Sequence, residues 1–79
     1  MNNQIKQIAD QADLIVNDYA FCKKGDLIQI VNLNSLQDAA VVNEQSQIIE
    51  TTMDDIEMNI VMDLYERNKV FMLQQYDNN

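Results

Sequence analysis

The clearest helical pattern of apolar residues lies in residues 51–67, TTMDDIEMNIVMDLYER. Apolar positions spaced three and four apart share one helix face, and here they are Met53, Ile56, Ile60 and Leu64. A hydroxyl at Thr51 or Thr52 can accept a hydrogen bond from the first turn. Three carboxylates follow at the positive end of the helix dipole, where negative charge is stabilising. They belong to Asp54, Asp55 and Glu57. The stretch therefore predicts a helix with a well-marked start.

This helix carries a second apolar strip beside the first, at about 100° per residue. Its members are Met58, Val61, Met62 and Tyr65. A surface helix usually needs a single stripe, so the pattern indicates a helix with two neighbours. One interpretation places it between a sheet and another helix of the same chain. The other places the second strip against another copy or a partner, because Met is common at adaptable binding surfaces.

The first part of the chain predicts another amphipathic helix, over residues 2–17, that ends near Asn17–Asp18. Its apolar residues fall in one narrow sector: Ile5, Ile8, Ala9, Ala12, Ile15 and Val16. Leu14 is the exception, because it points to the polar side.

Short apolar runs between polar turns follow from Tyr19 to Thr52, and they are typical of strands. The predicted strands are Tyr19–Cys22, Leu27–Leu33, Ala39–Val42 and Gln47–Thr51. Gly25 lies in the first turn, where it can adopt a positive φ. In the second strand Ile28, Ile30 and Asn32 share one side. The pattern predicts an antiparallel meander of three or four strands.

The order of helix, meander and helix predicts an α+β fold for a single small domain over residues 1–79, with both helices on the same sheet face. The pattern weakens after Arg67, and a break near Asn68–Lys69 would leave residues 68–79 as a short extra element or a frayed tail. The apolar run Val70–Leu73 (VFML) needs cover from its own sheet edge or from another subunit. The residues expected at an interface are therefore Met58, Val61, Met62, Tyr65, Val70, Phe71 and Leu73.

Charge narrows the classes of partner. The net charge is −8, and between Gly25 and Glu66 there are nine acidic residues and no Lys or Arg. Such a chain repels phosphate backbones and offers no basic patch to anionic membranes, so neither nucleic acid nor membrane is an expected partner. A basic protein suits this charge, and so does the simpler interpretation that the charge only keeps the chain soluble.

The residue types needed for catalysis are scarce. There is no His, so Ser and Cys lack the usual base, and a single Gly cannot form a phosphate-binding loop. Cys22 has no second Cys to pair with, which favours a reducing, cytoplasmic location and a packed rather than reactive thiol. The N-terminus has no signal-peptide pattern, and no stretch reaches the roughly 20 apolar residues of a membrane span. We expect no enzyme, cofactor or metal centre.

The sequence thus favours a small acidic interaction or regulatory protein that acts by protein–protein contact and forms a homodimer. A first alternative is an acidic inhibitor that resembles an antitoxin because it covers the surface of a basic protein. A second alternative belongs to another functional class: the protein binds a small ligand or a divalent cation through Glu57, Asp54 and Asp55. The Ca²⁺-binding EF-hand order is missing from these acids. Glu57 stands inside the apolar sector, where it could reach back to the N–H groups at the helix start, pair with a lysine, or line a pocket that raises its pKa.

Overall fold

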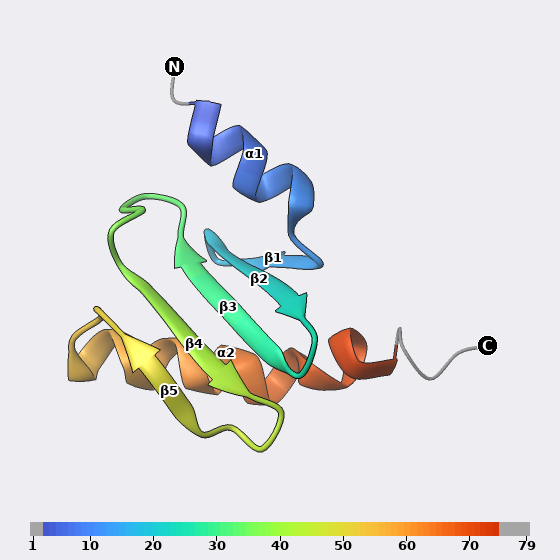
Figure 1. The fold of residues 1–79 in the computed structure, drawn as a ribbon. Coiled ribbons are helices and arrows are strands. Elements are labelled where there is room, and N and C mark those ends of the chain that lie inside the picture. The colour runs from blue at the N-terminus through green and yellow to red at the C-terminus, as the bar shows by residue number, and fades with distance from the viewer. Residues whose placement is uncertain (1–2, 75–79) are drawn as a thin grey trace.

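A computed structural model describes residues 3–74 and confirms the α+β class, with five strands instead of three or four (Figure 1). Each strand pairs antiparallel with the next, in the order β1-β2-β3-β4-β5. The elements are α1 Asn3–Gln11, β1 Leu14–Val16, β2 Tyr19–Lys24, β3 Leu27–Asn32, β4 Ala39–Asn43, β5 Ile48–Thr51 and α2 Asp55–Gln74.

The first helix is shorter than predicted, because α1 ends at Gln11 and the chain then forms the additional strand β1. Asn17 and Asp18 both have positive φ, at 51° and 68°, and they connect β1 to β2 as a two-residue hairpin turn. Asn and Asp tolerate this left-handed conformation better than most residues, and two positive φ values suit the twist of a tight hairpin. Leu14 now packs against the core, which explains its poor place in a helical pattern.

β3 has the two sides that the sequence predicts for it. Gly25, with a φ of 64°, lies in the turn between β2 and β3, as expected. Ile28 and Ile30 are fully buried on one side of β3, and Asn32 on the same side reaches α2. Leu27 and Gln29 lie on the other side, because side chains alternate along a strand.

α2 crosses one face of the sheet, behind β3 and β4 in Figure 1, and forms the core with it. α1 contacts β2, but no described side chain of α1 belongs to that core. The interpretation in which α2 lies between the sheet and the first helix is therefore wrong. The core beneath α2 consists of Phe21, Ile28, Ile30, Ala40, Val42, Met53, Met58, Val61, Leu64, Tyr65 and Met72.

The predicted break near Asn68–Lys69 is also wrong, since α2 continues to Gln74. Asn68 Nδ2 donates a hydrogen bond of 2.8 Å to the carbonyl oxygen of Leu64, and Lys69 Nζ lies 2.9 Å from Glu66 Oε1. Met72 then adds a buried side chain to the core, with an exposed fraction of only 1%. The last five positions of the predicted tail, 75–79, lie outside the described residues.

Candidate interaction surface

The start of α2 is fixed by side-chain hydrogen bonds to the backbone. Asp54 Oδ1 accepts a bond of 2.8 Å from the N–H of Glu57, so Asp54 is the capping residue. Thr51 Oγ1 accepts from the N–H of Met53, and Thr52 Oγ1 accepts from the N–H of Ala39 in β4. These bonds join the end of β5 to the start of the helix and set which side of α2 meets the sheet.

The inward side of α2 is the strip that the sequence had assigned to an interface. Met58, Val61 and Tyr65 are buried against the sheet, and Met62 packs at the edge of the same core. The predicted interface is therefore corrected at these four positions, because in this fold they belong to the core or pack against it. The reason is that the sheet covers the Met-rich strip and leaves Ile56 and Ile60 of the other apolar strip exposed.

The outward side of α2 carries Ile56 and Ile60, from the apolar strip that the sequence places in the core, together with Phe71, which the sequence places at an interface. Ile56, Ile60 and Phe71 have exposed fractions of 74%, 47% and 60%. Leu64 lies at the margin of this stripe and is buried. We call Ile56, Ile60, Asp63, Arg67 and Phe71 the outward stripe, because at about 100° per residue they fall on one side of the helix and all five side chains are exposed.

The other predicted interface residues lie at the C-terminal end of α2. Val70 and Phe71 are exposed, at 49% and 60%, as an interface would require. The backbone of Leu73 is helical, but its side chain is outside the described part of the chain. Because the helix continues without the expected break, Phe71 lies on the same side of α2 as Ile60.

Charged side chains flank the outward stripe. Arg67 Nε lies 3.1 Å from Asp63 Oδ2, one helical turn earlier, and both side chains are mostly exposed. Glu66 accepts a hydrogen bond from Ser46 in the turn before β5, and this bond, together with Lys69, lowers the pKa of the Glu66 carboxyl. The stripe thus contains an exposed ion pair, which contributes little to the stability of the fold and which a partner can rearrange.

Glu57 has a structural role on the opposite flank of α2. Its Oε2 accepts two hydrogen bonds of 2.8 Å, from the Tyr19 hydroxyl and from Asn32 Nδ2. Burial, followed by this bond to Glu57, raises the pKa of Tyr19 to about 12. These bonds tie α2 to β2 and β3, so Glu57 and Asp54 are both engaged within the fold. Among the described residues no group of three or more His, Cys, Asp or Glu side chains could hold a metal ion.

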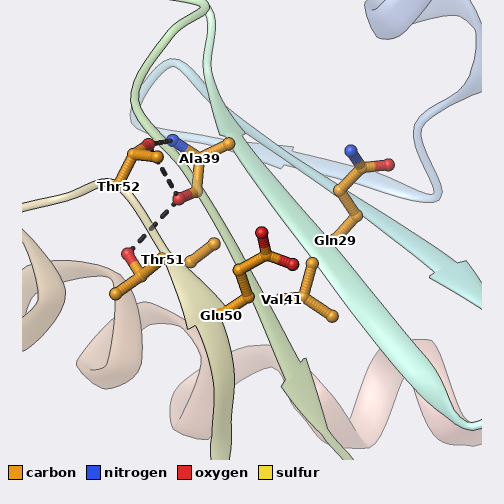
Figure 2. A pocket seen from close by; sticks show the side chains of 7 residues that line it. Gln29, Ala39, Val41, Glu50, Thr51 and Thr52 are labelled. Atoms are coloured by element: carbon orange, nitrogen blue, oxygen red, sulfur yellow. Dashed lines mark hydrogen bonds between the residues drawn. The ribbon is translucent and has the colours of Figure 1, made fainter.

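A shallow groove crosses the sheet face turned away from α2. Figure 2 shows Gln29, Val41 and Glu50 projecting from three neighbouring strands, with Thr51 and Thr52 hydrogen-bonded to Ala39 at one end. The volume is about 200 Å³, below the roughly 300 Å³ at which small-molecule sites begin. The groove is therefore too small to be a binding pocket by itself.

Cys22 is buried in β2, and burial is the main reason that the pKa of its thiol is raised. A thiol is a poor nucleophile when its pKa is raised. Within residues 3–74, no helix is long and apolar enough to cross a membrane.

Comparison with known proteins adds one result. The model of a family described as a family of unknown function (DUF7723) matches residues 2–72. This range contains all five strands and the outward stripe up to Phe71. No curated protein and no solved structure matches the chain.

Proposed function

The chain belongs to the family of unknown function DUF7723, and we propose that it is a small non-enzymatic interaction or regulatory protein that acts by protein–protein contact. The observation that supports this proposal is the two-sided α2. One apolar side completes the core, while the other leaves Ile56, Ile60 and Phe71 exposed to solvent. Exposed apolar residues that gather along one face commonly mark a contact site.

The free energy of burying apolar side chains also favours a contact surface on the outward side of α2. Burying an Ile or Phe side chain contributes about 1.5–3 kcal/mol, and Ile60 and Phe71 are about half exposed or more. A small domain has few such side chains to spare, because it buries a limited fraction of its surface. A partner that covers the outward stripe would recover this unused stabilisation.

Site-specific photo-crosslinking in cells tests the proposal without assuming the partner. A photo-reactive amino acid replaces Ile60 in one variant and Asn59, the adjacent solvent-facing residue, in the control. We expect a discrete covalent adduct from position 60 and little from position 59, because neighbouring helix positions point about 100° apart. Equal or absent adducts at the two positions would contradict the proposal.

A second candidate function is an acidic inhibitor, antitoxin-like, that covers a basic protein surface. It is favoured by the exclusively negative charges between Gly25 and Glu66. It is also favoured by exposed Glu50, whose side chain has no hydrogen-bond or ion-pair partner within residues 3–74. Such a complex would weaken steeply as salt rises. Binding to a basic protein with no salt dependence would rule out this candidate.

A further inference from the structure

We infer that the partner of the outward stripe is a second copy of this chain, with the two α2 helices packed antiparallel about a two-fold axis between Asp63 and Leu64. This inference rests on the proposed contact function and adds the identity and geometry of the partner. Each step below uses the exposed side of α2, from Ile56 to Phe71.

The outward stripe has a palindromic spacing. Four of its positions, 56, 60, 67 and 71, keep the same spacing when the order is reversed about the midpoint between 63 and 64. A two-fold contact uses the same patch on both subunits, so each position meets its mirror position on the partner. An antiparallel helix pair of this kind needs such a symmetric pattern, whereas a contact with an unrelated protein does not.

The residue pairs brought together are chemically compatible. Ile56 meets the partner's Phe71 at both ends of the contact, where two exposed apolar side chains cover each other. Ile60 meets the partner's Arg67, whose aliphatic stem can cover an apolar side chain while its guanidinium stays in water. That guanidinium then lies near Asp63 of the opposite helix, where it can form a planar, bidentate pair.

Arg67 is the only arginine of the chain, and it lies on this stripe. It already pairs with Asp63 of its own helix. In the antiparallel dimer the two Asp63–Arg67 pairs form one four-residue charge cluster across the axis. The cluster carries no net charge, so the centre of the contact avoids the repulsion that two acidic chains would otherwise meet.

The rest of the molecule opposes association electrostatically, and this gives the inference a distinctive signature. Each copy carries a net charge of −8. Salt screens repulsion between exposed charges beyond a Debye length of roughly 10 Å at 0.1 M. Self-association should therefore strengthen with salt, whereas a complex with a basic protein should weaken.

The test is the solution mass of the full chain, measured by sedimentation equilibrium over a concentration series at low and high salt. We expect dimers in the micromolar range, because a single helix pair lies near the low end of the roughly 1,200–2,000 Å² of stable interfaces. Ile60→Asp should yield monomers at every concentration, while Asn59→Asp, which adds the same charge beside the stripe, should leave the mass unchanged. Phe71→Ala provides a second, milder stripe variant, and circular dichroism verifies that each variant is folded.

A charge exchange tests the antiparallel geometry itself. Arg67→Asp alone and Asp63→Arg alone should each weaken the dimer at least tenfold, because they place like charges across the axis. The double variant Asp63→Arg with Arg67→Asp should restore it, since every cross-axis pair is again of opposite sign. A dimer that survives Ile60→Asp, or single variants that the double variant does not rescue, would overturn the inference.

The experiments distinguish failure of the dimer from failure of the proposed contact function. A monomer at all salts, combined with a crosslinked adduct to a different protein from position 60, would overturn the dimer and leave the contact function standing. No adduct at position 60 and a monomeric chain would overturn both.

Discussion

Glu57 shows how one residue can join three elements. A single carboxylate oxygen accepts from Tyr19 in β2 and Asn32 in β3, while the backbone N–H of the same residue is capped by Asp54. The acid that seemed misplaced in an apolar sector is therefore satisfied by two polar side chains on the sheet. The sequence suggests the helix start, a lysine or a pocket for Glu57, and it does not identify Tyr19 and Asn32, because these donors lie 38 and 25 residues away.

Tyr19→Phe removes one of these donors without changing the packing. We expect it to lower the free energy of unfolding at neutral pH by about 1–2 kcal/mol, since the acceptor is charged and part-buried. Urea denaturation measures this loss. Gln45→Ala, in the exposed turn between β4 and β5, provides the control, because the Gln45 side chain has no hydrogen-bond partner within residues 3–74.

The same substitution should change the pH dependence of stability. The pKa of Tyr19 is raised to about 12 in the folded chain, against about 10 for an unperturbed Tyr. Its contribution is therefore complete below pH 10 and is lost as pH rises through 12. We expect the unfolding free energy to fall more steeply between these values in the natural chain than in Tyr19→Phe. Equal slopes would contradict the assignment.

At the scale of the elements, the start of α2 depends on one specific acid. Asp54 caps the helix, whereas Asp55 is an exposed first-turn residue whose side chain has no hydrogen-bond partner within residues 3–74. Asp54→Ala should cost about 1 kcal/mol, and Asp55→Ala only a few tenths through the helix dipole. Thermal unfolding of the two variants, which remove the same charge, separates capping from electrostatics.

The continuity of α2 beyond Asn68 can be tested with two variants of neighbouring residues, one buried and one exposed. Met72 is buried and Phe71 beside it is exposed. Met72→Ala should destabilise the chain by about 2–5 kcal/mol, while Phe71→Ala should have little effect when both are measured at concentrations where the chain is monomeric. Equal effects would mean that the helix does not continue in register past Asn68.

The sequence was informative about which elements exist and less so about which side of each faces inward. The meander was predicted because period-two alternation and Gly25 are local signals. The segment 14–16 was assigned to a helix, since three residues are too few to show a strand period. Ile56 and Ile60 of the first strip face outward while the second strip faces the sheet, because both strips are apolar and only the tertiary fold decides which one the sheet covers.

At the scale of the whole molecule, the excess of negative charge should weaken the fold at low salt. Self-repulsion destabilises a compact state that carries −8. Glu50→Gln removes one exposed charge that has no described partner, so it should raise the unfolding free energy by a few tenths of a kcal/mol. The gain should vanish at high salt, where repulsion is screened. A gain independent of salt would point to a local cause at Glu50.

The uninterrupted strand order has a consequence for how the chain is made. A ribosome releases the N-terminal residues first, and every strand of this sheet pairs with the one released just before it. The sheet can therefore assemble hairpin by hairpin during translation, without waiting for distant segments. The side chains of Ile28, Ile30 and Val42 nevertheless stay exposed to solvent until α2 leaves the ribosomal exit tunnel and covers them. The nascent chain is most vulnerable to aggregation, and most dependent on chaperones, in that interval.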